Sequence, residues 1–575
     1  MLKDLQHLQG ELSILQLENI VSARDALEAS MRDKKLLVKL DLEWDGHTYD
    51  TKCEREILDK LQPHKNLKIL AINYYGGTRF PDWLGDHSFS NIETLHLGNC
   101  RSCIFLPPLG QLPSLKGLTV TNFEAVVTVG SEFYGSKFST RKPFGALEIL
   151  RFEDMLEWQE WFSFADEDES RPFSHLRELY MHNCPKLSRA LPKHLPCLAK
   201  LSIMKCKQLM ATFPGVRVIR ELELGNCNKV PLKELLPGLL KLTVHGGAPN
   251  LKSLSDCMYS HLEEMNISHC STLHKVPERL KALKIENCGR LDFPSIHCCY
   301  IFLERLSITC SCGSLKIFPL DLFPKLSTLY ICRCSSLESL SASDECQQDL
   351  ISLCALELCR CINFVSFPKG GLRAPNPTSL WIYGCEKLEL LPEDMHTFLP
   401  SLQSLNLFNC PKLESFPDGG LPSNLNSLVI SNCDKLIAKR LELGLQRLPS
   451  LKDLTIMGQC EDVVSFPEEG LLPTSLTSLS ISEFSSLEYL NNELQHLTLL
   501  QELEIFGCLK LKWFPDEGLP VSLSYLRIKR CPLLKQSCQQ GSGEDWSKIC
   551  HIPASKLTTM SPYHKLCSDY FLFWS

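Results

Sequence analysis

The chain has 575 residues, of which 44% are hydrophobic and 22% are charged, so it can bury an extensive core. Its 60 basic and 67 acidic side chains leave a formal charge of -7, a balance that disfavours nucleic acid and anionic membranes as partners and favours proteins. The N-terminal MLKDLQHLQGELSILQLENI lacks the apolar segment of a signal peptide, and no apolar run is long enough to span a membrane. The sequence therefore indicates a folded protein that is not exported.

A leucine ladder runs through almost the whole chain. The template L-x-x-L-x-[LIVMF] recurs at a usual spacing of about 23 to 25 residues in about 22 units, which is the range of leucine-rich repeats. The first template position falls on Leu12, Leu37, Leu67, Ile92, Leu115, Leu147, Leu176, Leu198, Ile219, Leu239, Leu262, Leu280, Leu303, Leu326, Leu353, Pro377, Leu402, Leu425, Leu451, Leu476, Leu500 and Leu523. The pattern predicts an α/β solenoid, a leucine-rich-repeat horseshoe. We divide it into an N-terminal capping repeat (1–36), a solenoid (37–535) and a C-terminal cap and tail (536–575).

Two early repeats predict short helices on the outer side. Ser22-Ala23-Arg24-Asp25 and Thr51-Lys52-Cys53-Glu54 have the pattern of a capping box, in which an N-cap side chain and an acid three residues later satisfy free backbone N–H groups. We expect these helices to end near Asp33 and Gln62. Elsewhere prolines and glycines interrupt the segments between strands, which predicts a mostly irregular convex side.

Each repeat also predicts one short parallel strand. Because successive side chains of a strand alternate between its faces, template positions four and six, such as Leu405 and Leu407, should face the core. Positions three, five and seven should face solvent, as Ser404, Asn406 and Phe408 would. We call the surface formed by positions three, five and seven of all repeats the concave face.

Phe-Pro recurs later in the chain at spacings of 48 to 50 residues, about twice the repeat length. The phenylalanines are Phe318, Phe367, Phe416, Phe466 and Phe514. In four of these cases Gly-Leu follows, which predicts a tight turn after a phenylalanine that fills the solenoid core.

Most of the 29 cysteines are explained by the repeat. Thirteen occupy the ninth template position, where leucine-rich repeats place a small buried Asn or Cys: Cys100, Cys184, Cys206, Cys227, Cys270, Cys288, Cys334, Cys361, Cys385, Cys410, Cys433, Cys508 and Cys531. Such thiols favour a structural role over metal binding, and so many of them indicate a reducing compartment.

Two further cysteines differ from this set. Cys332 and Cys359 hold position seven of successive repeats, so they should lie one strand apart on the concave face. Chance adjacency is the favoured interpretation, and a redox contact or weak metal site is the alternative. Phosphate-binding loops, serine-hydrolase elbows and metalloprotease motifs are absent, so we expect neither an enzyme nor a catalytic, cofactor or metal site in this chain.

Aromatic residues mark the candidate binding surface. They are prominent at concave-face positions, and aromatic side chains on a solvated sheet are enriched in protein-binding hot spots, although packing against neighbouring repeats is an equal alternative. The predicted protein-binding residues are Tyr330, Trp381, Tyr383, Phe408, Phe506, Tyr525 and Arg527. Charged concave-face residues, such as Lys39, Asp41 and Glu504, are expected to form solvated faces or cross-strand pairs.

Several stretches resemble plant intracellular nucleotide-binding leucine-rich-repeat disease-resistance proteins of the coiled-coil class. They are LKDLQHLQGELSILQLENIVSARDALEASMRDKKLLVKLDLEWDG, LQPHKNLKILAINYYGGTRFPDWLGDHSFSNIETLHLGNC, LPPLGQLPSLKGL, VGSEFYG, LEILRFEDMLEWQEW and, near the C-terminus, CPLLKQSCQQGSGEDWSKICHIP. The resemblance implies the recognition and autoinhibition module of a cytoplasmic immune receptor. Its implied partners are a pathogen effector or guarded host protein and the nucleotide-binding domain of a full-length receptor.

The chain departs from that family pattern in one respect. It contains neither the coiled coil nor the nucleotide-binding domain with its phosphate loop, so ATP or ADP would belong to the missing domain and no cofactor is expected here. The alternative is a stand-alone repeat adaptor, such as a ubiquitin-ligase substrate receptor, which would need an F-box-like helical segment before Leu12.

Overall fold

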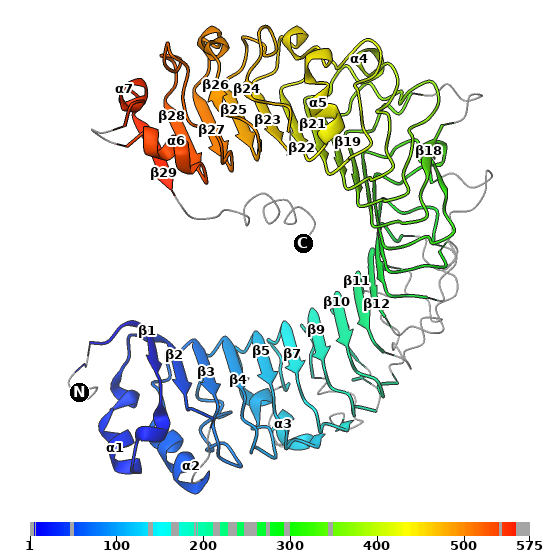
Figure 1. Ribbon diagram of the computed structural model, residues 1–575. Coiled ribbons are helices and arrows are strands. Elements are labelled where there is room, and N and C mark those ends of the chain that lie inside the picture. The colour runs from blue at the N-terminus through cyan, green and yellow to red at the C-terminus, as the bar shows by residue number, and fades with distance from the viewer. Residues whose placement is uncertain are drawn as a thin grey trace. The chain divides into compact units, whose positions relative to one another are not determined.

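The chain forms two compact units, residues 1–280 and 281–575, each a parallel-strand solenoid (Figure 1). This computed structural model describes residues 5, 7–46, 51–135, 142–162, 172–188, 191–192, 194–210, 219–227, 238–246, 261–271, 276–291, 300–342, 349–459, 461–539 and 543–558. The predicted repeat solenoid is confirmed, and few helices interrupt it.

In the first unit, each repeat adds one strand to a parallel ladder. The strands lie along the inner edge of this unit in Figure 1, and the helices lie on its outer side. In chain order they are β1 (Gly10–Ile14), β2 (Leu37–Glu43), β3 (Ile69–Asn73), β4 (Thr94–Gly98), β5 (Gly117–Thr121), β7 (Ile149–Glu153), β9 (Glu178–His182), β10 (Lys200–Met204), β11 (Glu221–Gly225), β12 (Lys241–His245) and β13 (Glu264–Ser268).

The second unit repeats this arrangement. Its strands are β14 (Ala282–Glu286), β15 (Arg305–Thr309), β17 (Thr328–Cys332), β19 (Ala355–Cys359), β20 (Ser379–Tyr383), β21 (Ser404–Phe408), β22 (Ser427–Ser431), β23 (Asp453–Met457), β25 (Ser478–Ser482), β27 (Glu502–Phe506), β28 (Tyr525–Lys529) and β29 (Ala554–Thr558). The last strand, β29, lies beyond the last repeat that the leucine template identified, and α6 (Pro532–Ser537) and α7 (Trp546–Ile549) precede it.

Side chains alternate as the strand period requires. Leu405 and Leu407 are fully buried, and Phe408 is half-buried on the concave face. The prediction for Asn406 is wrong. This residue was expected to face solvent, but it is only 4% exposed. Trp381 and Val429 occupy the paired positions on the two neighbouring strands and flank it, while its amide donates to the Ser404 hydroxyl at 2.8 Å.

The predicted register of the first repeat is wrong by three residues. Leu12 pairs with Leu40, so it occupies template position four rather than position one. Leu15, expected to face the core, is 60% exposed. The letters L-x-x-L-x-L occur here by coincidence, and backbone pairing with β2 determines which leucines face inward.

The two predicted helices form with shorter spans. α1 (Ala23–Glu28) begins after Ser22, whose hydroxyl accepts a hydrogen bond from the Asp25 amide at 3.3 Å. It ends before Asp33 because Ser30 adopts a left-handed conformation, and a short 3-10 turn covers the remaining residues. α2 (Thr51–Lys60) ends two residues before Gln62. The other outer helices are α3 (Ser131–Tyr134), α4 (Met395–Phe398) and α5 (Asp434–Ala438).

Short strands lie behind the main ladder, and two of the five Phe-Pro phenylalanines, Phe318 and Phe466, are on them. Three pairs form there: β6 (Thr128–Val129) with β8 (Glu160–Trp161), β16 (Ile317–Pro319) with β18 (Ser339–Ser341), and β24 (Ser465–Phe466) with β26 (Tyr489–Leu490). Phe318, Phe367, Phe466 and Phe514 are buried as predicted. Phe416 is the exception, since it is only half-buried.

The chain leaves most strands through one residue with positive φ, at template position eight. Asn and Gly tolerate this left-handed conformation better than other residues, and Asn99 (φ 56°), Asn226 (φ 52°) and Gly384 (φ 64°) occupy it. Asparagines of successive repeats also bond to each other, as Asn432 does to Asn409 at 2.9 Å. This turn directs the ninth residue into the core.

We predict that Leu405→Asp lowers the free energy of unfolding by at least about 3 kcal/mol, because it removes a buried leucine and buries an unpaired charge. Leu15→Asp, at an exposed leucine of the first repeat, is the matched control and should leave stability nearly unchanged. Urea unfolding followed by circular dichroism measures both variants. Equal midpoints for the two would contradict the assigned register.

Candidate functional site

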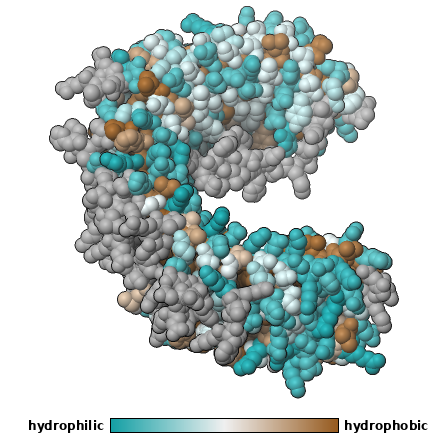
Figure 2. Space-filling model, turned by 180° about the vertical axis from the view of Figure 1, so that it is seen from behind, coloured by the Kyte–Doolittle hydropathy of each residue, from teal (hydrophilic) through white to brown (hydrophobic). Residues whose placement is uncertain are grey.

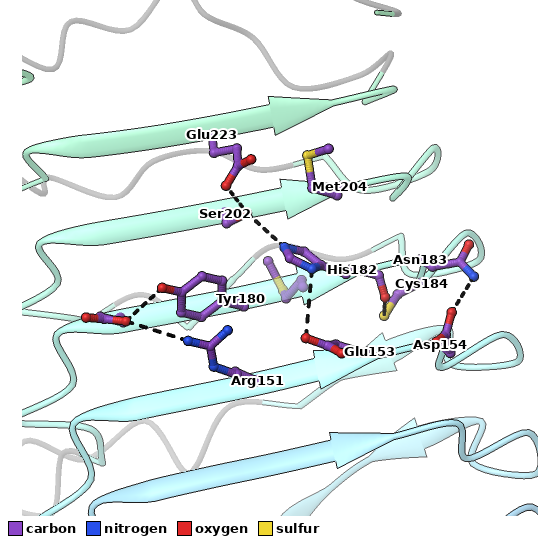
Figure 3. Close-up of polar contacts among 12 residues, drawn as sticks. Arg151, Glu153, Asp154, Tyr180, His182, Asn183, Cys184, Ser202, Met204 and Glu223 are labelled. Carbon is purple, nitrogen blue, oxygen red and sulfur yellow. Dashed lines mark hydrogen bonds and ion pairs between the residues drawn. The ribbon is translucent and has the colours of Figure 1, made fainter. Parts of the chain in front are cut away.

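The concave face of the first unit carries a connected polar network on β7, β9, β10 and β11 (Figure 3). His182 lies at its centre, 3.9 Å from Glu153 and 2.8 Å from the Ser202 hydroxyl, which donates to Glu223 at 2.9 Å. Glu223 in turn lies 3.8 Å from His245 on the next strand. Each side chain comes from a different repeat, so the register of the ladder creates the network.

This network contains the order acid, histidine, serine that nucleophilic catalysis uses. Ser202, however, is fully buried, and its proton points to Glu223. A nucleophile must present its oxygen to a substrate beside its base, and Ser202 does not. The arrangement thus fits a structural hydrogen-bond network.

A second polar row lies beside it at template position three. Glu178 accepts a hydrogen bond from Tyr180 at 2.7 Å and lies 4.0 Å from Arg151, whose guanidinium sits 3.7 Å from the Tyr180 ring centre (Figure 3). The pKa of Tyr180 is raised mainly by burial and, to a smaller extent, by the hydrogen bond to Glu178. The row continues with Lys200–Glu221 and Lys241–Glu264, each at 3.5 Å.

Sequence reasoning missed this row, although a signal was present. Position three of five successive repeats alternates in charge through Glu178, Lys200, Glu221, Lys241 and Glu264. Opposite charges on neighbouring strands attract, so the alternation indicates cross-strand pairing. The concave-face charges of this unit are therefore largely satisfied within the protein.

The second unit presents an aromatic surface instead. Trp381 and Tyr383 project from β20 and Phe408 from β21, all half-buried. The Trp381 and Phe408 rings stack with centres 6.2 Å apart, and Tyr383 lies 6.2 Å from Phe408. We call these three residues the aromatic cluster.

Tyr330 lies near this cluster but on the far side of Glu357. The register pairs Tyr330 on β17 with Glu357 on β19, and Glu357 with Trp381. Burial raises the pKa of Glu357, and no hydrogen bond or ion pair of this carboxylate exists among the described residues. Sequence reasoning missed this acid, because only the register shows that two aromatic residues flank it.

The other predicted binding residues form a separate group near the C-terminus. Phe506 lies on β27 with Arg530 5.4 Å from its ring centre, and Tyr525 and Arg527 lie on β28. Arg527 forms a 3.0 Å ion pair with Glu504, so it is engaged in the cross-strand pair that the sequence suggested. In the first unit, Lys39 pairs with Glu11 across strands at 3.2 Å and with Asp41 of its own strand at 3.4 Å.

The thirteen ninth-position cysteines are all buried and unoxidised. Each thiol donates to the carbonyl oxygen two residues earlier, for example Cys100 to Gly98 at 3.3 Å and Cys410 to Phe408 at 3.3 Å. Burial raises the pKa of Cys361 and Cys385 to about 12. These cysteines therefore close the turn after the strand, and the structural interpretation is confirmed.

Cys332 and Cys359 are cross-strand partners, as their spacing predicted. Their exposure differs from the prediction, because Cys332 is only 6% exposed and Cys359 is half-buried. No group of three or more metal-binding side chains that could hold an ion occurs in the described part of the chain.

Comparisons with known proteins point to one family. The family of R13L1/DRL21 leucine-rich repeats matches residues 1–123. The disease resistance protein At3g14460 of Arabidopsis thaliana is 30% identical over 734 residues, covering 96% of this chain and 51% of that protein. The disease resistance RPP13-like protein 1 of the same plant is 32% identical over 310 residues, covering 50% of this chain and 28% of that protein. The chain thus spans about half the length, or less, of these relatives.

A solved structure supports the fold alone. CroV588, a circular leucine-rich-repeat protein, superposes with a TM-score of 0.50 at 15% identity, covering 93% of this chain and 87% of that one. Within the residues that the structure describes, no helix has the length and apolar character needed to cross a membrane.

We predict that iodoacetamide at pH 8 labels the exposed thiols of Cys197, Cys354 and Cys550 and leaves Cys361 and Cys385 unlabelled in the native chain. The thiolate is the reactive form, and a pKa of about 12 keeps a buried thiol protonated far above neutral pH. Mass spectrometry of tryptic peptides measures each site, with guanidinium-unfolded chain as the control. Equal native labelling of both groups would show that the ninth position is open to solvent.

Proposed function

Because this chain belongs with the leucine-rich-repeat regions of plant nucleotide-binding disease resistance proteins, we propose that it is the recognition and autoinhibition module of an immune receptor. Its concave face would bind a pathogen effector or a guarded host protein in the cytoplasm. A second surface would hold the nucleotide-binding domain of the full-length receptor inactive. ATP or ADP would bind in that domain, and the role of this chain is recognition rather than catalysis.

The aromatic cluster is the observation that carries the recognition part of this proposal. Trp381, Tyr383 and Phe408 are half-buried on the concave face, so part of their surface is open to solvent. Burying the rest against a partner is favourable at roughly 25 cal/mol per Å² of apolar area. Tyr330 extends this surface, and Phe506, Tyr525 and Arg527 would form a second contact area.

The first unit contrasts with this surface. The charges of its concave face are mostly paired with each other, so a partner would have to separate existing ion pairs to use them. The view of the molecule in Figure 2 is mainly hydrophilic or neutral, with hydrophobic residues in scattered small groups. The paired charges of the first unit favour the second unit as the site of recognition.

The test replaces the repeat region of a coiled-coil-class receptor with this chain and measures effector-dependent cell death in leaves against a panel of effectors. We expect the chimera to be silent alone and to respond to at least one effector. The double variant Trp381→Ala and Tyr383→Ala should then lose at least about 90% of that response, because hot-spot aromatics supply most of the binding energy.

Tyr489→Ala with Trp513→Ala is the matched control. It also removes one tyrosine and one tryptophan, but these two exposed residues form a bridge behind the main ladder. An unchanged response in the concave-face variant, with protein levels equal, would place recognition elsewhere. Cell death without any effector would contradict autoinhibition by this chain.

A further inference from the structure

Two thiols meet on the concave face at the ends of β17 and β19. Cys332 and Cys359 are direct Cα partners in a parallel ladder, whose strands are spaced about 4.8 Å apart. That spacing falls within the Cα separations that disulfides span, roughly 4.4 to 6.8 Å. Both residues hold template position seven, so both side chains project from the same face.

The surroundings favour a thiolate at this pair. The neighbouring Cys359 thiol is the largest influence that lowers the pKa of Cys332. The Tyr330 hydroxyl and the positively charged guanidinium groups of Arg333 and Arg360 lower it further. Together they lower the pKa of Cys332 to about 6, against the opposing effect of burial. Arg360 is held nearby by its 3.3 Å hydrogen bond to the Tyr383 hydroxyl. The thiolate, rather than the thiol, is the nucleophile in reactions with oxidants.

Other neighbouring thiols show what is particular about this pair. Cys410 and Cys433 are also neighbours across successive repeats, and the Cys410 thiol raises the pKa of Cys433. They occupy position nine, point into the core and are fully buried. Among the residues that the structure describes, Cys332 and Cys359 are the two cysteines that occupy concave-face positions.

We propose that Cys332 and Cys359 form an oxidation site for a small hydroperoxide, such as hydrogen peroxide, and that the product is a disulfide between two successive repeats. The Cys332 thiolate attacks one peroxide oxygen, so a sulfur–oxygen bond forms while the oxygen–oxygen bond breaks and hydroxide leaves. The Cys359 sulfur then attacks the Cys332 sulfenic acid. The sulfur–sulfur bond forms, the sulfur–oxygen bond breaks, and the Cys359 proton leaves with that oxygen as water.

The electrons balance over the two steps. Two thiols lose two electrons in total, and one peroxide is reduced to two waters. The new bond would lie beside Tyr330 and Tyr383, which belong to the predicted binding surface. The site is independent of whether that surface binds an effector.

The experiment treats the purified, reduced 575-residue chain with an equimolar amount of hydrogen peroxide at pH 7. Free thiols are then alkylated, and nonreducing digestion with mass spectrometry identifies linked peptides. We expect the Cys332–Cys359 link to form first and the Cys410–Cys433 link to stay absent. The rate at which the Cys332–Cys359 link forms should fall about tenfold between pH 7 and pH 5, because protonation removes the Cys332 thiolate.

Two variants make the result decisive. Cys359→Ser should leave a sulfenic acid at Cys332 that dimedone traps, and Cys433→Ser should leave the Cys332–Cys359 link unaffected. Circular dichroism checks that both variants fold. The proposal is overturned if Cys332 stays reduced while the exposed Cys197, Cys354 and Cys550 are oxidised, or if Cys410 and Cys433 link at the same dose.

Discussion

The parallel backbone ladder is the constraint on which the other features of this protein depend. Each repeat contributes a short strand whose hydrogen bonds set its neighbour about 4.8 Å away in register. Template positions four and six are buried by this alternation, and positions three, five and seven form columns along the concave face. The left-handed residue at position eight then turns the chain and places a buried thiol at position nine in thirteen repeats.

Because the ladder brings equivalent positions together, the chemistry of the concave face depends on pairs of residues from different repeats. In the first unit, such pairs are mostly opposite charges and hydrogen-bonding groups, as in the chain from Glu153 through His182 and Ser202 to Glu223. In the second unit, Trp381 stacks on Phe408 and Glu357 lies between two aromatic residues. The two units therefore offer a partner very different surfaces with the same backbone.

Cysteine shows how position alone changes the behaviour of one residue type. At position nine the thiol is enclosed, burial raises its pKa, and its hydrogen bond closes a turn, as at Cys361. At position seven the same residue type lies on the concave face, where a second thiol, a tyrosine hydroxyl and two arginines stabilise the thiolate of Cys332. The two positions differ in their neighbouring groups rather than in exposure, since Cys332 and the ninth-position Cys334 are both 6% exposed.

The sequence by itself determined the solenoid, the inward leucines and the role of the ninth-position cysteines, because a period held over many repeats leaves few other ways to bury its leucines. It also identified the aromatic side chains and the adjacency of Cys332 and Cys359. The tertiary structure alone decided the register at Leu12, the burial of Asn406, the place of Glu357 between Tyr330 and Trp381, and the network around His182. These features depend on which residues of different repeats lie side by side, and that pairing is a property of the folded backbone rather than of local sequence.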